Sequence, residues 1–252
     1  AGHGESDLPS SLQENAESEH YTFTSLSLLT EETVPEDADL VVIYAPQSDI
    51  SETERDTLLN YLAGGGKMLM VLDYTETAQP NLAAVMAQYG MTMEDGIVLE
   101  GDATHHMRGS NYYLLPDIDS HDITDPIKDG GYYILMPVAR GLTLDTSLRS
   151  GLTVSALLET SSDAYAKLDG YAMTTYDKED GDIDGPFVLG AAASETTESG
   201  EEAQLVVFTS ARMFEQATSS LVAGANDDLF LNALDWMCER ASAISIRTKS
   251  LD

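Results

Sequence analysis

Cysteine and basic residues are scarce in this sequence of 252 residues. The single cysteine, Cys238, excludes an intrachain disulfide and a cysteine-rich metal site. Lysine and arginine number 12 against 44 aspartates and glutamates, which gives a formal net charge of −32. Such a surface repels phosphate backbones and anionic membrane surfaces, so we expect no nucleic-acid partner. No apolar run approaches the roughly 20 residues that are needed to span a bilayer.

Signatures of common enzymes and metal sites are also missing. The sequence has no G-x-S-x-G nucleophile elbow and no H-E-x-x-H zinc motif. His105 and His106 are neighbours, and because successive side chains on a strand point to opposite faces, they are poorly placed to chelate one ion. Cys238 follows Trp236 on the apolar side of a predicted helix, where a thiol usually serves packing. These residues predict no cofactor.

One acidic segment partly matches a calcium-binding loop. Asp180, Asp182 and Asp184 alternate and a glycine follows them, as in the first half of such a loop. The second half differs, because Pro186 and Ala191 stand where a carbonyl ligand and a bidentate glutamate belong. The segment therefore predicts either a weak calcium site or an acidic turn at a hairpin tip.

Two apolar runs with a polar stretch between them predict a βαβ unit. The runs DLVVIYAP (39–46) and KMLMVLDY (67–74) fit strands that are buried on both faces of a parallel sheet. Between them, Ser51 and Glu54 have the spacing of a helix capping box. A strand, a helix and a strand within about 35 residues form a right-handed crossover with parallel strands.

Three glycines at 64–66 lie at the edge of the sheet that does not bind ligands. They follow a helix and precede a strand, so they serve to end the helix rather than to cradle a phosphate. Ligands of open α/β sheets bind beyond the carboxyl ends of the strands. The candidate ligand-binding positions are therefore Pro46, Asp73 and Tyr74, which follow the two strands.

The complete chain is predicted to be one α/β domain: a parallel sheet flanked by helices, with a mostly antiparallel β extension or insertion. We assign the core to residues 1–90 and 204–240, the β-rich extension to residues 91–203, and a tail or short strand to residues 241–252. Further elements expected in the core are a helix over 8–19, a strand over 21–28, a helix over 80–90, a strand over 204–210 and a helix over 226–240 capped by Asn226.

Several activities remain open at this point. Asp73 is a candidate acid or base, so an amidotransferase-like hydrolase is one hypothesis, which requires a histidine within about 2.6–3.2 Å of it. A strand-end aspartate more often caps the next helix or binds backbone amides. Tyrosine pairs at 112–113 and 132–133 offer stacking faces for a carbohydrate-binding module, although one member of each pair is expected to face the core. His3 and Glu5 lie in an N-terminal loop that belongs to the same edge as Asp73 if a strand precedes it.

Several segments occur in an order that is characteristic of one family: GHGE (2–5), a block over 34–73, HDIT (121–124), PVAR (137–140), LLETS (157–161), NDDLFLNALDWM (226–237) and ISIRTKS (244–250). Their order and spacing resemble the extracytoplasmic domain of the gliding-motility-type auxiliary components of ABC transporters. The resemblance covers nearly the whole chain. The block over 34–73 alone also resembles trehalose-utilisation-type and other amidotransferase-like domains.

The resemblance implies a fold similar to class I glutamine amidotransferases and flavodoxin, without the catalytic triad. Family members are membrane proteins whose soluble domain lies outside the cytoplasm between hydrophobic segments, with a strand just upstream of the GHGE loop. We therefore expect a non-enzymatic, excised domain that is membrane-anchored in the full-length protein. Its implied partners are the permease and ATPase subunits of the transporter, or a small ligand. His3, Glu5 and His121 match recurrent family positions, and we expect them to line a pocket at the sheet edge.

Overall fold

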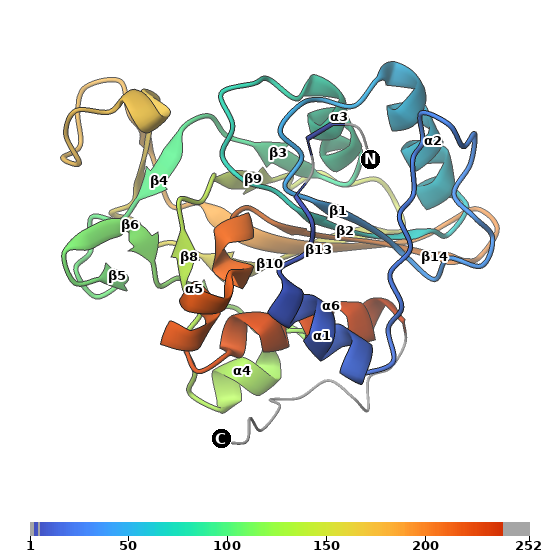
Figure 1. Cartoon of the computed structure of the whole chain (residues 1–252). Helices are drawn as coiled ribbons and strands as arrows, with labels where there is room; N and C mark the ends of the chain where they lie inside the picture. The colour runs from blue at the N-terminus through green and yellow to red at the C-terminus, as the bar shows by residue number, and fades with distance from the viewer. Residues whose placement is uncertain (1–2, 5, 239–252) are drawn as a thin grey trace.

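The computed structural model describes residues 3–4 and 6–238 as a three-layer α/β arrangement around a mixed sheet (Figure 1). The main sheet has eight strands, and its central path runs β1-β2-β14-β13-β10-β7; β9 pairs with β13, and β3 pairs with β9. These strands are β1 Val41–Tyr44, β2 Lys67–Val71, β3 Met91–Met93, β7 Asp117–Ile118, β9 Leu142–Leu144, β10 Leu152–Glu159, β13 Val188–Thr196 and β14 Glu202–Phe208.

Helices cover both faces of this sheet, and each face has its own apolar core. Leucines and methionines of α2 and α3 pack on one face, whereas α1, α4 and α6 pack on the other (Figure 1). The helices are α1 Ser10–Ser18, α2 Glu52–Ala63, α3 Pro80–Gln88, α4 Asp125–Asp129, α5 Gln216–Leu221 and α6 Ala225–Met237, with short 3₁₀ turns at Gly170–Ala172 and Ala211–Phe214.

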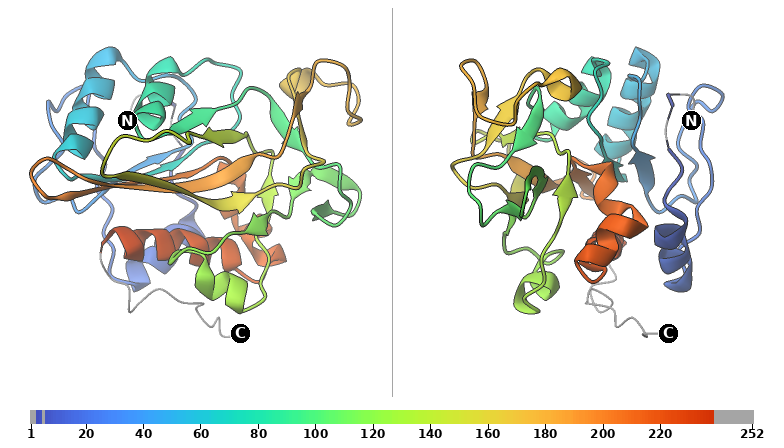
Figure 2. Two further views of the ribbon diagram at one scale, coloured as in Figure 1. Left: turned by 180° about the vertical axis from the view of Figure 1, so that it is seen from behind. Right: turned by 60° about the vertical axis from the view of Figure 1, so that its left-hand side comes forward.

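Two small antiparallel sheets stand at one end of the main sheet (Figure 2). One has the order β12-β11-β4 and the other β5-β6-β8. Their strands are β4 Ile97–Leu99, β5 His106–Met107, β6 Ser110–Leu114, β8 Met136–Pro137, β11 Tyr165–Lys167 and β12 Ile183–Asp184. They lie near the carboxyl ends of β1, β2 and β14, since the ring of Tyr74, just after β2, contacts Tyr171 in the loop after β11.

The predicted βαβ unit is confirmed. Strands β1 and β2 pair in parallel, with Val41 opposite Met68 and Tyr44 opposite Val71. Ser51 accepts a hydrogen bond from the Glu54 backbone N–H while the Glu54 side chain accepts one from the Ser51 N–H, which is the complete capping box. Helix α2 ends at Gly64, and Gly65 has a φ of +93°, the left-handed conformation that glycine adopts without strain.

Part of the β-rich extension belongs to the main sheet. Its two longest strands, β10 and β13, belong to the main sheet, and β13 pairs with β14 along seven residues from Gly190 to Thr196. The antiparallel character of the extension is confirmed by the pairings of β10 with β13 and of β11 with β4. The sheet is therefore mixed, with a parallel part formed by β1, β2 and β14.

Two predictions about the core were wrong. Residues 21–27 alternate like a strand but adopt no regular secondary structure, because they form no ladder with β1. Asn226 does not cap α6, since Gly224 occupies the N-cap. Asn226 is instead fully buried, and its side chain bonds the backbone of Leu135 and of Met213. The predicted tail over 241–252 lies outside the described residues.

Candidate functional site

A small cavity opens where the three parallel strands end. Because β1, β2 and β14 are adjacent and parallel, the residues that follow them meet at one rim: Ala45 after β1, Asp73 after β2 and the Ala211–Phe214 turn after β14. The cavity has a volume of about 190 Å³. Its lining residues are Ser6, Asp7, Pro9, Tyr44, Ala45, Asp73, Ala211, Arg212 and Glu215. We call it the rim cavity.

Tyr44 and Ala45 fix the wall of the rim cavity on the β1 side. Ala45 has a φ of +47°, so the chain turns sharply as soon as it leaves the strand. The buried hydroxyl of Tyr44 donates a hydrogen bond to the carbonyl of Ala211 at 2.9 Å, which ties the end of β1 to the turn after β14. Burial, together with the nearby carboxylates of Glu215 and Asp73, raises the pKa of Tyr44, so it remains a neutral donor.

Asp73 is the most unusual charged group of the rim. Its Oδ2 lies 3.6 Å from Nε of Arg212, while its Oδ1 is buried and has no hydrogen-bond partner among the described residues. Burial raises the pKa of Asp73, although Arg212 opposes this shift. A buried carboxylate oxygen without a donor is costly, and binding of a ligand that supplies an N–H or O–H would relieve that cost.

Arg212 links the rim cavity to the loop after β11. Its Nη2 donates a hydrogen bond to the hydroxyl of Tyr171 at 2.6 Å, and its guanidinium lies 5.7 Å from the centre of that ring. Tyr171 in turn packs edge-on against Tyr74, with ring centroids 5.0 Å apart. Gly170 passes close beside the Tyr74 hydroxyl, since a Cβ at residue 170 would lie 1.8 Å from that oxygen. Tyr74 therefore supports the neighbouring loop and does not line the rim cavity.

Two other predicted site residues, His3 and Pro46, lie near the rim but do not line the rim cavity. The carbonyl of His3 accepts hydrogen bonds from the backbone N–H groups of Gln47 and Ser48, and its Nε2 lies 2.8 Å from Glu54 Oε1. The Pro46 carbonyl accepts a hydrogen bond from Gln79. Both His3 and Pro46 therefore lie near the end of β1. Glu5 lies outside the described residues.

His121 lies on the face of the sheet that is covered by α1, α4 and α6, and not at the rim. Its ring packs against Trp236 of α6 at a centroid distance of 5.2 Å, and burial lowers its pKa. None of the five histidines, all of which the structure describes, forms a hydrogen bond or ion pair with Asp73. The acid–imidazole pair that an amidotransferase-like hydrolase requires is thus not formed by Asp73 in this structure.

The acidic segment at 177–185 is held by lysines. The Nζ of Lys167, an almost fully buried side chain, pairs with Glu179 and with Asp182 at 3.2 Å, and Lys178 pairs with Asp184. Asp182 also accepts a hydrogen bond from the Glu179 backbone. Within residues 3–4 and 6–238 no group of three or more acidic, histidine or cysteine side chains is arranged to hold a metal ion. The calcium loop predicted at Asp180, Asp182 and Asp184 gains no support from this arrangement.

The expectation that one tyrosine of each pair faces the core holds for the pair at 112–113, where Tyr112 packs against a small buried cluster around Leu99 and Tyr165, and was wrong for the pair at 132–133. Tyr132 and Tyr133 are 39% and 68% exposed. Tyr112 and Tyr113 are both half-buried, and the ring of Tyr112 packs at a tilt against that of Tyr176, with centroids 5.3 Å apart. Tyr132 and Tyr133 are therefore more accessible than the alternation of strand side chains predicted, because these two residues do not lie in a strand.

Sequence reasoning missed Arg212 and Glu215. The run QLVVFTS (204–210) was recognised as a buried strand, and its orientation parallel to β2 would have placed the following residues at the same rim. The signal was therefore available in the residues just after the strand. The pairing of β14 with β2 could not be known, because the two strands are separated by 130 residues of other structure.

Comparison with known proteins assigns a family to this fold. The family described as an ABC-type uncharacterized transport system matches residues 2–238. The chain belongs to this family. Its members are auxiliary components of an ABC-type transport system. No curated protein matches this chain. None of the described helices is both long and apolar enough to traverse a bilayer.

One solved structure supports the fold of this family member. The chain is similar to a structure described as the mmIFT52 N-terminal domain, with a TM-score of 0.65, 16% identity and 94% of each chain covered. A weaker likeness, with a TM-score of 0.42 and 14% identity, is to a ThuA-like protein from Bacteroides uniformis ATCC 8492, over 80% of this chain and 70% of that one. The first likeness shows a shared fold and nothing about activity.

Proposed function

We propose that this family member is a non-catalytic, extracytoplasmic domain that binds a small ligand or a partner protein at the rim cavity. The observation that carries the proposal is the Oδ1 atom of Asp73, a buried acceptor without a donor beside Arg212. Sheets of this type bind ligands at the carboxyl ends of their parallel strands, and the rim cavity lies there. We further propose that the fold is flavodoxin-like and that permease and ATPase subunits are the partners.

The chemistry of the rim cavity favours binding over catalysis. Among the residues that the structure describes, those lining the cavity supply carboxylates, a guanidinium and hydroxyls, but no thiol and no imidazole. Asp73 also has no histidine partner, and a hydrolase needs an activated nucleophile or water. The proposal of a non-enzyme therefore depends on the composition of this cavity.

Variants at the two opposite ends of the strands test the proposal. In the membrane-extracted transporter complex, Arg212→Ala and Glu215→Lys are expected to reduce co-purification of the auxiliary component with the permease at least tenfold. Glu198→Lys, in the exposed hairpin loop at the opposite edge, is the matched charge control and is expected to leave it unchanged. Equal recovery of all three variants and the unaltered protein would show that the rim makes no contact with the complex. Soaking or titration with small-molecule libraries would then identify whether the rim binds a free ligand.

A carbohydrate is the second candidate ligand, because one half-exposed tyrosine contacts Arg212 of the rim and another lies exposed beside Tyr112. Tyr171, which is 51% exposed, accepts a hydrogen bond from Arg212, and Tyr176, which is 53% exposed, packs at a tilt against Tyr112. Aromatic rings of this kind stack on apolar faces of ligands. A glycan array that shows no binding to the unaltered chain would remove this candidate.

A further inference from the structure

A long loop between β11 and β12 exposes side chains that are usually buried. Residues 168–182, which we call the tyrosine loop, contain one short 3₁₀ turn and project from the end of the molecule, in gold in Figure 1. Seven large apolar or aromatic side chains are exposed within the described parts of the chain, and three of them, Leu168, Tyr171 and Tyr176, belong to this loop. Such a concentration on one loop is typical of a contact surface.

The backbone of the tyrosine loop is held in place from beneath. The Tyr176 carbonyl accepts hydrogen bonds from the hydroxyl of Tyr165 and from the side chain of Asn111. The Nζ of Lys167, whose side chain is almost fully buried, donates to the Asp177 carbonyl at 3.0 Å. A loop that is already ordered loses little conformational entropy when a partner binds, so its exposed rings are preorganised contacts.

The two exposed tyrosine rings are each supported on one side. Tyr171 packs edge-on against Tyr74, and Tyr176 packs at a tilt against Tyr112. The guanidinium of Arg212 already lies 5.7 Å from the centre of the Tyr171 ring. The parts of both rings that remain exposed can pack against apolar groups or against a further guanidinium.

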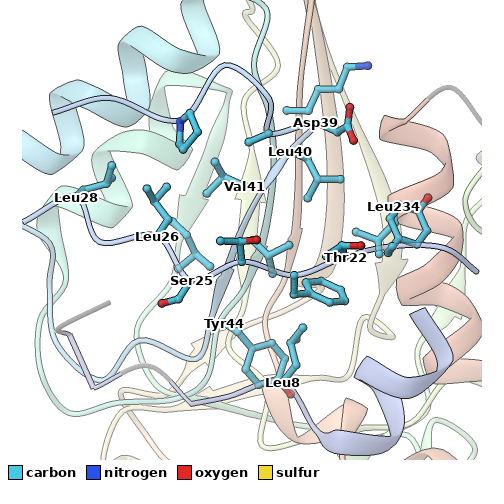
Figure 3. A pocket seen from close by; sticks show the side chains of 18 of the residues that line it. Leu8, Thr22, Ser25, Leu26, Leu28, Asp39, Leu40, Val41, Tyr44 and Leu234 are labelled. Atoms are coloured by element: carbon cyan, nitrogen blue, oxygen red, sulfur yellow. The ribbon is translucent and has the colours of Figure 1, made fainter. Parts of the chain in front are cut away.

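Apolar side chains in the large groove beside β1 belong instead to the packing of the domain. This groove, of about 1470 Å³, lies between β1 and residues 20–28 (Figure 3). Tyr44 is buried there, and Leu26 and Leu40 pack against the cores on the two faces of the sheet. The tyrosine loop differs from this groove, because its rings are about half exposed although the backbone that carries them is anchored.

Carboxylates without a cation lie beside both exposed tyrosines. Asp169 precedes Tyr171 by two residues and Asp177 directly follows Tyr176, and both aspartates are exposed. Neither carboxylate forms an ion pair among the described residues, since the two neighbouring lysines pair with other acidic side chains. An arginine of a partner complements both features, because a guanidinium can stack on an aromatic ring and pair with a nearby carboxylate. A second copy of this chain is a poor partner, since its formal charge of −32 repels the loop.

We propose that the tyrosine loop docks on a partner protein whose surface combines apolar contacts with arginine side chains. Tyr171 and Tyr176 supply most of the binding free energy, and Asp169 and Asp177 orient the partner through ion pairs with its arginines. The proposal rests on the proposed function, in which a transporter subunit is the partner, and it adds a contact surface beyond the rim cavity.

Photo-crosslinking in the membrane-extracted transporter complex tests this contact directly. Benzoylphenylalanine in place of Tyr176 is expected to crosslink to a transporter subunit. The same group in place of Tyr133, which is 68% exposed in the segment after α4, is the matched control. We expect the control to give less than a tenth of the crosslinked product.

A pair of variants at one position tests the contribution of the ring. Tyr176→Ala is expected to reduce co-purification with the transporter subunit at least tenfold, whereas Tyr176→Phe retains the ring and is expected to change it less than twofold. Both variants keep the backbone carbonyl that anchors the loop. If Tyr176→Ala nevertheless speeds proteolysis of the loop, the crosslinks and the charge variants decide the outcome.

A double variant tests the contribution of charge. Asp169→Asn combined with Asp177→Asn preserves the side-chain shapes and removes both charges, so we expect co-purification to fall at least fivefold at low salt and the difference to shrink at high salt. Glu198→Gln, in the exposed hairpin loop between β13 and β14, is the matched control and is expected to have no effect.

Several results would overturn the proposal. One is a crosslink yield at position 176 that does not exceed the yield of the Tyr133 control, and another is unchanged co-purification of both Tyr176→Ala and the double aspartate variant. Crosslinks between two copies of this chain would assign the loop to a homodimer. Glycan binding by the unaltered chain that Tyr176→Ala abolishes, without loss of co-purification, would assign the loop to a carbohydrate.

The rim variant Glu215→Lys separates this proposal from the proposed function. If Glu215→Lys reduces co-purification and Tyr176→Ala does not, the tyrosine loop is not a docking surface and the role of the rim stands. If only Tyr176→Ala reduces it, the loop is the contact and the rim is not. If neither variant reduces it, both proposals fail.

Discussion

Removing the side-chain amide of Asn226 should destabilise the whole domain. Asn226 is completely buried at the start of α6, where its Oδ1 accepts a hydrogen bond from the Leu135 N–H at 3.1 Å. Its Nδ2 donates to the carbonyls of Leu135 at 2.8 Å and Met213 at 2.6 Å. One side chain thus joins α6, the segment before β8 and the turn after β14.

The expected magnitude follows from the three hydrogen bonds. Each contributes about 1 kcal/mol, and in Asn226→Ala all three backbone partners remain buried, so we expect a loss of about 3–4 kcal/mol of unfolding free energy. With a urea m-value of about 3 kcal/mol/M, the denaturation midpoint falls by about 1 M. Asn226→Asp retains the acceptor but loses both donors and buries a charge, so its loss should be at least as large.

Equilibrium urea denaturation measures this loss, with the fluorescence of the single tryptophan, Trp236, and far-UV circular dichroism as probes. Asn60→Ala, at an exposed position of α2, is the matched control and should change stability by less than about 0.5 kcal/mol. A loss below about 1 kcal/mol in Asn226→Ala, with an unchanged m-value, would refute the assignment of Asn226 as a cross-link between three segments.

Two further predictions concern buried charges. Lys167→Met leaves Asp182 buried without its cation, so we expect the free energy of unfolding to fall by about 3 kcal/mol. We also expect faster proteolysis of the loop at 168–182, and an unchanged cleavage rate would contradict the role of Lys167 in anchoring this loop. For Asp73, burial raises the pKa above the unfolded value, so the ionised group destabilises the fold above both pKa values and this penalty disappears as pH falls through them. Asp73→Asn should therefore be more stable than the unaltered chain at pH 7 and gain little or nothing near pH 3, in paired urea denaturation at both values. A gain that is equal at both values would argue against this origin.

Local signals in the sequence were sufficient for the βαβ unit. The buried runs that became β1 and β2 and the capping box at Ser51 and Glu54 are properties of short segments, so they could be read without knowing what packs against them. Residues 21–27 show the limit of this reasoning. Their alternation satisfies the pattern of a strand, but a strand exists only if another strand pairs with it, and the pattern does not reveal the partner.

The candidate site was predictable only in part. Asp73 was placed correctly at the carboxyl end of a parallel strand, because the order of strand and helix fixes that edge. Arg212 was not found, since its position depends on the pairing of β14 with β2. His121 and Asn226 were misjudged for a similar reason: a polar residue next to an apolar run has several uses, and the tertiary contacts of Trp236 and Leu135 decide among them.

The position of β14 has a consequence for biosynthesis. Strand β14 lies between β2 and β13, so β1 and β2 cannot join the strands beyond β13 until residues 202–208 have left the ribosome. Roughly 140 residues separate β2 from that point, which takes about 7 to 27 s of translation at about 5 to 20 residues per second. During this interval the edge of β2 that later pairs with β14 has no neighbouring strand, and the apolar side chains of β2 are not fully covered. The nascent chain then depends on chaperones or on its high negative charge to avoid aggregation.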